Sequence, residues 1–451
     1  MERGEVVSKV RQSDVQLVRF LYCDNGGVIR GKTAHVDDLE GRLSAGIGLT
    51  VAMQAMNSLD QLQSVSGMGP VGEIRLVPDP DTFVVLPYAP RAAAMLSDMV
   101  TLDAQPWDAC PRSFLKRMVK RAAGEGLQFK AGFEPEWSLA VRVEDRYVPF
   151  DETLCFSSIG MQTAATVIDE VVEAIGKQGM RVEQYYPELG HGQQELSIRY
   201  APALRAADNQ VLYRETVRAV AYKNGYFASF APKPWPEHAG NGCHIHLSVW
   251  DPSGEENLFF DRSAPYQLGR LGRQFAAGLL EHLPGLIALT CPSYNSYHRL
   301  QPQSWSSAYT CYGPDNREAA VRIVSTYWGQ EMPSINLELK ASDNSANPYL
   351  ALGGVIAAGL DGITRGLELG EERLALEDPF TIPGEEREAR GIHRLPESLS
   401  AALEALQADS LLTDALGGLL LTSFLAVRRS EWEAYSAQGP AFEHKHHFWK
   451  Y

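Results

Sequence analysis

The sequence has little of several features that would assign it to a specialised class of protein. Its 451 residues contain no run approaching the ~20 apolar residues that a membrane-spanning helix needs. The opening residues, Met1–Glu5, lack the apolar segment of a secretory signal peptide. Internal repeats and low-complexity segments are absent as well. We therefore expect a cytoplasmic globular protein.

Cysteine and positive charge are also scarce. The six cysteines are scattered and form no C-x-x-C pair, which favours free thiols over a disulfide framework or a zinc site. Lys and Arg total 41 against 56 Asp and Glu, giving a net charge of −15, and no basic stripe stands out. Nucleic acid and anionic membranes are therefore not expected as partners. An anionic substrate would need a local cluster of arginines.

The length and the pattern of strands predict two domains, one of them large. Residues 14–35 predict a hairpin with its turn at 24–27, and residues 72–86 and 93–100 carry further strands. These segments indicate a small β-rich domain over residues 1–105. Residues 106–451 then form the large domain.

The large domain combines helices and strands. A helix is expected over 111–124 and a strand over 127–139. Residues 370–395, rich in Glu, Arg, Pro and Gly, indicate an exposed loop. Further helices are predicted at about 161–179, 204–224, 264–283, 347–367 and 396–436.

The stretch from Asn241 to Trp250 alternates strictly between apolar and polar positions, which predicts a strand with one buried face. Its other face carries His244, His246 and Ser248. Two histidines and a serine can offer a metal ligand beside a phosphate contact. A half-buried strand whose histidines only form hydrogen bonds would show the same pattern.

Carboxylates on other predicted strands favour the metal interpretation. Glu134 and Glu136 share one face of a strand, and Glu188 and Glu195 flank a glycine-rich turn. Glu338 lies among apolar residues. Buried carboxylates are costly unless a cation neutralises them, although a solvent-facing strand would need none. Oxygen-rich ligand sets suit Mg²⁺ or Mn²⁺, and two such ions would serve phosphoryl transfer.

The arginine cluster that an anionic substrate requires is present. Arg299, Arg317 and Arg322 occur close together in the sequence. A guanidinium group binds carboxylate or phosphate through two parallel hydrogen bonds. Each arginine taken alone could equally lie on a solvent-exposed loop.

Together these motifs resemble the glutamine synthetase family, and the match runs from about residue 14 to the end. The segments that carry the resemblance are 132–136, 192–195, 231–234, 242–248, 295–299, 316–317 and 347–350. The resemblance implies an α+β fold with an N-terminal β-grasp domain. It also implies a large catalytic domain built on a curved, mainly antiparallel sheet with flanking helices. Family members form stacked rings of identical subunits, so a homo-oligomer, expected to be a dodecamer, is implied.

The resemblance also implies a role for each candidate residue. The ligands of the first metal ion would be Glu136, Glu188 and Glu195. Those of the second would be Glu134, His244 and Glu338. ATP would contact Glu183, His246, Ser248 and Arg322. The substrate would contact Gly240, Arg299, Arg317 and Lys340, where Lys340 replaces the usual arginine. Catalytic roles would fall to Arg299, Arg317 and Glu136.

The implied reaction has L-glutamate, ATP and an amine as substrates, with two or more Mg²⁺ or Mn²⁺ ions at each site. ATP phosphorylates the side-chain carboxylate of glutamate, because oxide is a poor leaving group. An amine then attacks the acyl phosphate and gives an amide, ADP and phosphate. The cations and arginines stabilise charge on the transferred phosphoryl group.

The sequence departs from the family on the amine side. Trp305 stands where ammonia-using members have a glutamate, and Thr50 is the nearest match to an aspartate that helps to bind ammonium. An indole packs on a carbon substituent or holds an alkylammonium by a cation–π contact. We therefore expect a γ-glutamylamide synthetase that uses an organic primary amine. The alternatives are a glutamine synthetase that uses ammonia and a non-catalytic structural relative.

Overall fold

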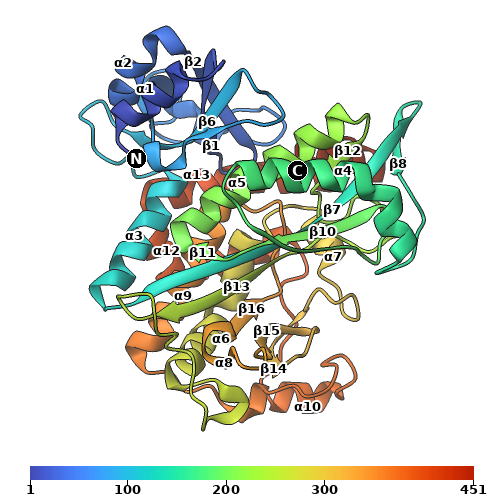
Figure 1. The fold of residues 1–451 in the computed structure, drawn as a ribbon. Coiled ribbons are helices and arrows are strands. Elements are labelled where there is room, and N and C mark those ends of the chain that lie inside the picture. The colour runs from blue at the N-terminus through green and yellow to red at the C-terminus, as the bar shows by residue number, and fades with distance from the viewer.

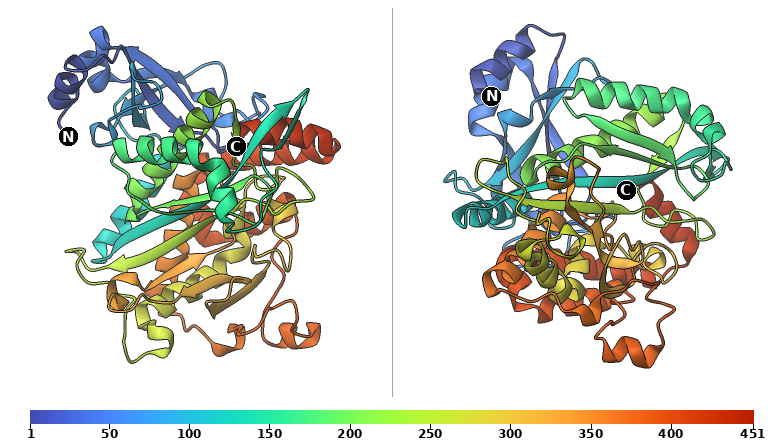
Figure 2. Two further views of the ribbon diagram at one scale, coloured as in Figure 1. Left: turned by 45° about the vertical axis from the view of Figure 1, so that its right-hand side comes forward. Right: turned by 60° about the horizontal axis from the view of Figure 1, so that its bottom comes forward.

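The computed structural model describes residues 1–451 as a small N-terminal part attached to a larger one (Figure 1). Each part is built on its own sheet, of six strands within residues 17–100 and of ten within residues 128–339. The N-terminal part stays at one end of the molecule in the two other views (Figure 2). The α+β fold with two sheets agrees with the prediction.

The N-terminal sheet is mixed. The predicted hairpin is present, because β1 (Leu17–Cys23) pairs antiparallel with β2 (Ile29–His35). β1 also pairs parallel with β6 (Ala92–Val100), and the strand order is β2-β1-β6-β4-β3. The remaining elements are α1 (Arg3–Arg11), α2 (Leu39–Ala45), β3 (Ile47–Thr50), β4 (Glu73–Pro78) and β5 (Val84–Val85).

The large sheet is antiparallel except for one pair. Its main path runs β14-β15-β16-β13-β7-β10-β9, and only β14 and β15 are parallel. The strands on this path are β7 (Gln128–Val143), β9 (Val182–Pro187), β10 (Gln193–Ile198), β13 (Cys243–Trp250), β14 (Tyr309–Pro314), β15 (Ala319–Val324) and β16 (Asn336–Leu339). Three short strands also pair with β7, namely β8 (Arg146–Pro149), β11 (Ala201–Pro202) and β12 (Phe227–Ser229).

Alternation along β13 separates the core from the site, as predicted. The side chains of Cys243, Ile245, Leu247 and Val249 are buried in the main hydrophobic core. His244, His246 and Ser248 lie on the opposite face and line a cavity. Because side chains alternate between the faces of a strand, one strand serves both packing and chemistry.

Long helices pack against the large sheet. They are α3 (Pro111–Gly124), α4 (Ser158–Lys177), α5 (Ala203–Lys223) and α6 (Arg270–Thr290), and α9 (Pro348–Arg365) packs on α3, α5 and α6. The closest packing joins α6 to α9, where Gly278 meets Gly362. A Cβ added at Gly278 would lie 2.2 Å from the backbone oxygen of Ala358, so this approach requires glycine.

Several predicted boundaries were wrong. α6 begins at Arg270 instead of 264, because a 3₁₀ turn covers Pro265–Gln267, and it continues to Thr290. The segment 396–436 forms three helices, α11 (Leu399–Ala408), α12 (Ser410–Leu416) and α13 (Gly418–Ser436). Asp409 caps α12, and Gly417, with a φ of 81°, separates the last two.

Short helices account for the other differences. α10 (Gly384–Ala389) lies within the segment expected to be an exposed loop, where Ile382 and Ile392 are buried. Five further helices were not predicted: α1 and α2 in the N-terminal part, and α7 (Ser296–Arg299), α8 (Glu331–Ser334) and α14 (Pro440–Lys450) in the large part. α14 carries Glu443, which forms hydrogen bonds or ion pairs with Asn295 and His298 next to the site.

Buried polar contacts join the two parts. The guanidinium group of Arg112 lies 2.8–2.9 Å from the carboxylates of Asp79 and Asp98 in the N-terminal part and Asp208 on α5. α13 packs against the N-terminal part, beneath the blue domain in Figure 1. These contacts hold the two sheets in a fixed position relative to each other.

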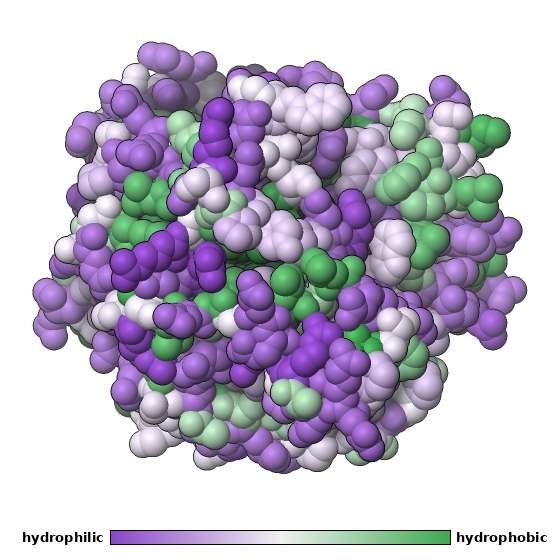
Figure 3. Space-filling model, turned by 90° about the horizontal axis from the view of Figure 1, so that it is seen from below, coloured by the Kyte–Doolittle hydropathy of each residue, from purple (hydrophilic) through white to green (hydrophobic).

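The surface seen from below mixes hydrophilic and hydrophobic residues, and apolar side chains gather near a hollow at its centre (Figure 3). No single helix is long and apolar enough to cross a membrane. One pair, α12 with α13, passes that test by length and composition only, and it is bent by 106°.

Candidate active site

A cavity of about 990 Å³ opens on the polar face of the large sheet. Its lining includes all fifteen residues that the sequence assigned to a site: Glu134, Glu136, Glu183, Glu188, Glu195, Gly240, His244, His246, Ser248, Arg299, Trp305, Arg317, Arg322, Glu338 and Lys340. Thr50, in the N-terminal part, does not line it. Residues separated by up to about 200 positions in sequence are thus brought to one place by the strand order.

The register between strands explains how the acidic and basic groups meet. Directly opposed residues of neighbouring strands point to the same face of a sheet. The opposed pairs are His244 with Glu134, His246 with Glu338, Arg322 with Glu338, and Glu195 with Glu136. A slip of one residue on β13 would turn both histidines into the core.

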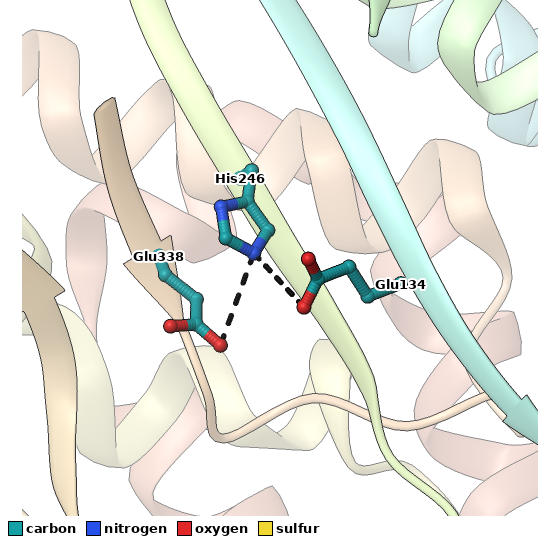
Figure 4. Close-up of side chains that lie close together, drawn as sticks. All are labelled: Glu134, His246 and Glu338. Carbon is teal, nitrogen blue, oxygen red and sulfur yellow. Dashed lines mark ion pairs between the residues drawn. The ribbon is translucent and has the colours of Figure 1, made fainter. Parts of the chain in front are cut away.

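The tightest group consists of Glu134, His246 and Glu338, drawn in Figure 4. The Nε2 atom of His246 lies 3.1 Å from Oε2 of Glu134 and 3.9 Å from Oε1 of Glu338. His244 is close behind, with its Nδ1 atom 3.3 Å from Oε1 of Glu338 and 3.8 Å from Oε2 of Glu134. Either histidine could therefore complete a metal site with the two carboxylates.

The ring of His246 fits a cation in particular. Its Nδ1 atom lies 2.8 Å from Oδ1 of Asn336, and its buried Nε2 atom faces the carboxylates of Glu134 and Glu338. A hydrogen bond from Nδ1 fixes the ring in this orientation, so that Nε2 could bind a cation in exchange for its proton. The donor set of one imidazole and two carboxylates suits a divalent cation.

The charges of this group stabilise one another. Burial opposes charge on His246, but Glu134 outweighs it and raises the pKa of His246 to about 9. Burial likewise opposes charge on Glu134 and Glu338. Contact with His246 nevertheless holds the pKa of Glu134 well below its ordinary value, and Lys340 lowers the pKa of Glu338 to about 2. His246 and Lys340 thus supply the positive charge that the carboxylates need.

A second group of carboxylates lies at β9 and β10 and has no such cation. Burial, then the charge of Glu136, raises the pKa of Glu188 to about 7. Burial, with Glu134 and Glu136, raises the pKa of Glu195 well above its ordinary value. Carboxylates that repel one another in a buried cavity are stabilised by a bound cation. The geometry therefore brings one ligand group together, at Glu134, His246 and Glu338, and the mutual repulsion of the second group would favour a further cation there.

Neighbouring polar groups hold this second group in place. The Nε2 atom of Gln193 donates to Oε2 of Glu136 at 2.8 Å and to the backbone oxygen of Gly240 at 2.9 Å. The hydroxyl of Tyr186 donates to Oε1 of Glu195 at 2.6 Å. No role was predicted for Gln193, Tyr186 or Asn336. The place of Gln193 in a glycine-rich motif could have indicated a role at the site, but no motif in the sequence marks Tyr186 or Asn336.

The predicted arginines occupy different depths. Arg299 is 5% exposed and lies 3.2 Å from Nε2 of His244 and 3.3 Å from the backbone oxygen of Ser342. Arg322 donates to Oε2 of Glu338 at 2.9 Å. Arg317 lines the cavity. A buried guanidinium at the carboxylate groups and two others nearer the opening can bind an anionic substrate together.

Aromatic side chains line part of the cavity wall. Trp305 is 62% exposed and lines the cavity together with Phe156 and Tyr186. The rings of Phe156 and Tyr186 meet edge to face with centroids 5.0 Å apart. Aromatic faces attract organic cations and pack on apolar groups, so this wall can accept a carbon-containing amine.

Models of two protein families match the chain. Residues 108–447 match the glutamine synthetase catalytic domain, and residues 1–107 match the glutamine synthetase N-terminal domain. Between them they cover nearly every residue of the chain.

Curated relatives align over nearly their whole length. The gamma-glutamylpolyamine synthetase GlnA3 of Streptomyces coelicolor is 36% identical over 436 residues, covering 96% of this chain and 93% of the relative. The glutamine synthetase of Mycobacterium tuberculosis is 33% identical over 450 residues, covering 97% of each chain.

Solved structures show the same fold. A structure described as a novel glutamine synthase homolog has a TM-score of 0.85 and 36% identity, covering 96% of this chain and 97% of that one. A complex of GmaS with ADP has a TM-score of 0.85 and 29% identity, covering 98% of both chains.

Proposed function

The chain belongs to the glutamine synthetase family, and from that membership we propose that it joins the γ-carboxylate of L-glutamate to an organic primary amine. Members of this family are carboxylate–amine ligases that depend on ATP and divalent metal ions. The proposed products are a γ-glutamylamide, ADP and phosphate. The observation that carries the choice of an organic amine is the indole of Trp305 in the cavity wall, where ammonia-using members have a carboxylate.

The residues of the cavity have different proposed roles in phosphoryl transfer. We assign Glu136, Glu188 and Glu195 to one Mg²⁺ or Mn²⁺ ion and Glu134, His244 and Glu338 to a second. These ions would neutralise charge on the phosphates of ATP. His246 lies against two carboxylates of the second set, so it holds that set in position beside the nucleotide.

Recognition of the substrates is assigned to the other lining residues. Glu183, His246, Ser248 and Arg322 would contact ATP. Arg299 and Arg317 would bind the carboxylates of glutamate and then the transferred phosphoryl group, with Lys340 beside them. Gly240 would present backbone to the bound glutamate. A Cβ at that position would lie 2.9 Å from Cγ of Arg299, so only glycine leaves the arginine in its place.

The amine must arrive as a neutral nucleophile. An alkylammonium has a pKa near that of lysine, ~10.4, and must lose a proton before it attacks the acyl phosphate. Glu188 and Glu134 are the carboxylates available to accept that proton. The aromatic wall suits a small amine with an apolar substituent, and an aromatic amine, already neutral, would need no base on binding.

The alternative in the same family is a glutamine synthetase that uses ammonia, and curated relatives of that name at 33% identity favour it. A non-catalytic structural relative is a poorer explanation. All six proposed metal ligands are retained, and without a cation Glu195 is repelled by Glu134 and Glu136.

Further proposals follow from the family. We propose a cytoplasmic homo-oligomer of stacked rings, a dodecamer, with residues 1–105 as the N-terminal domain and 106–451 as the catalytic domain. In such rings the N-terminal domain of a neighbouring subunit would complete each site.

The Trp305→Glu variant tests the proposal. Restoring a carboxylate at this position should weaken use of organic amines and strengthen use of ammonia, measured as kcat/KM from phosphate release. Trp328→Glu is the matched control, because that indole is 99% exposed and does not line the cavity. Equal effects of both substitutions on the ratio of amine to ammonia use would refute the role given to Trp305.

A further inference from the structure

Glu318 is a buried carboxylate that the reaction described above does not use. It follows Arg317 directly and precedes β15, and only 8% of its surface is exposed. Unlike Arg317, it does not line the cavity. A buried carboxylate is costly unless its oxygens are hydrogen-bonded, so its partners indicate what it does.

Its main partner is the backbone of the loop that presents Trp305. The backbone N–H of Trp305 donates to Oε1 of Glu318 at 2.6 Å. Burial raises the pKa of Glu318, but the N–H groups of Trp305 and Gln303 act in the opposite direction and favour the charged form. A charged acceptor forms a stronger hydrogen bond to a backbone N–H than a neutral one does.

The loop needs such support because its backbone is strained. Gln303, Trp305 and Ser307 have φ values of 56°, 54° and 67°, in the left-handed region that side chains other than glycine rarely adopt. Conformations of this kind persist where the surrounding structure holds them. Ser307 supplies one further tie through its hydroxyl, which donates to the backbone oxygen of Arg317 at 3.2 Å.

Glu318 is itself held in the turn that precedes β15 and carries Arg317. Its own N–H donates to Oδ1 of Asn316 at 2.9 Å, and Nδ2 of Asn316 donates to the backbone oxygen of Ala375 at 2.9 Å. The carboxylate of Glu318 therefore links this turn to the loop that carries Trp305. Trp305 and Arg317, on opposite sides of the contact, both reach the cavity.

We propose that Glu318 is the positioning residue that sets amine selectivity, by holding the backbone of Trp305 so that its indole forms the wall of the amine site. The proposal rests on the proposed use of an organic amine. It assigns to Glu318 no contact with substrate, because the side chain is buried behind the loop and its oxygen is occupied by the N–H of Trp305.

The test compares three variants of the full-length protein. Glu318→Ala removes the acceptor, Glu318→Gln keeps an oxygen acceptor without the charge, and Glu385→Ala is a control on the exposed face of α10. We expect Glu318→Ala to raise the KM for the best organic amine by about tenfold, the equivalent of 1.4 kcal/mol, with kcat and the KM for ATP little changed. Glu318→Gln should restore most of the affinity, and Glu385→Ala should match the unmodified enzyme.

Hydrogen exchange of the peptide that spans 301–307 supplies a readout independent of activity. We expect faster exchange in Glu318→Ala than in Glu318→Gln or the control. Unchanged exchange in Glu318→Ala would overturn the proposal. So would a loss of kcat in Glu318→Gln at unchanged KM, because that result would make Glu318 a proton acceptor.

The use of an organic amine and the positioning role of Glu318 can be refuted by different results. If the unmodified enzyme prefers ammonia while exchange at 301–307 still increases in Glu318→Ala, the contact holds the loop but not an amine site, and the selectivity role is wrong. If the enzyme prefers an organic amine and only the alanine variant loses that preference, both proposals are supported.

Discussion

Replacement of Arg299 by lysine tests the anion-binding geometry while keeping the charge. The guanidinium is 5% exposed and is held between His244 and the backbone of Ser342. A Cβ added at Gly242 would lie 2.5 Å from its NH2 atom, so the surroundings closely fit this side chain. An ammonium is a point charge without the planar pair of donors and cannot bind a carboxylate or phosphoryl group in the same way.

The expected loss follows from the value of one such donor in the transition state. Removing a preorganised donor costs about 2.7–4 kcal/mol, so kcat/KM for glutamate should fall about 10²-fold or more in Arg299→Lys. The assay is phosphate release at saturating ATP and amine, with thermal unfolding recorded for both proteins. Arg262→Lys, outside the cavity lining, serves as the control. A change below about threefold with an intact fold would show that Arg299 is not at the reacting group, since an electrostatic donor has a larger effect.

Three further substitutions test the metal sites, a pH-dependent contact and the joint between the two parts. Glu195→Ala should abolish turnover at saturating Mg²⁺ and Mn²⁺ without lowering the melting temperature in EDTA, because it removes one of several mutually repelling carboxylates. His282 lies 2.7 Å from Asp409 and 3.0 Å from Asp361; burial opposes its charge, but the two aspartates raise its pKa above the ordinary value. The raised pKa stabilises the protein fully below pH ~6.5 and progressively less as the pH rises through the folded-state value, so His282→Asn should lower the melting temperature more at pH 6 than at pH 9. Arg112→Met leaves the buried Asp208 without its cation, and Asp79 and Asp98 with Lys116 alone, and should lower the free energy of unfolding by about 3–5 kcal/mol, measured in urea.

Each of these predictions has a result that contradicts it. Activity in Glu195→Ala at either metal would exclude it as a metal ligand. An equal loss of stability at both pH values would mean that His282 acts by packing alone. Lys120→Met, on the exposed side of the same helix, is the control for Arg112→Met. Equal urea midpoints for the two variants would show that the Arg112 contact adds nothing to the free energy of unfolding.

Much of the site could be predicted because its chemistry lies on strands. Strict alternation over Asn241–Trp250 separates core from cavity residues without further information. The carboxylates on the neighbouring strands follow the same rule. Their convergence depends on the strand order, which local periodicity does not contain and which the family resemblance supplied.

Other features depend on contacts that local sequence does not reveal. His246, and not His244, forms the tightest group with Glu134 and Glu338 because of how its side chain is oriented and because it is hydrogen-bonded to Asn336. The continuous apolar pattern over 396–436 concealed two helix ends, because Asp409 and Gly417 interrupt the backbone but not the buried stripe. The left-handed conformation of Trp305 depends on a carboxylate thirteen residues later.

Competition between ammonia and organic amines identifies the nucleophile that the enzyme uses. Phosphate release by the unmodified enzyme would be measured with glutamate, ATP and Mg²⁺, comparing ammonia with a broad panel of alkyl amines, polyamines and aryl amines. The account predicts a higher kcat/KM for at least one organic amine than for ammonia, with the γ-glutamylamide confirmed by mass spectrometry. A higher kcat/KM for ammonia than for every amine in the panel would contradict it and identify the protein as a glutamine synthetase.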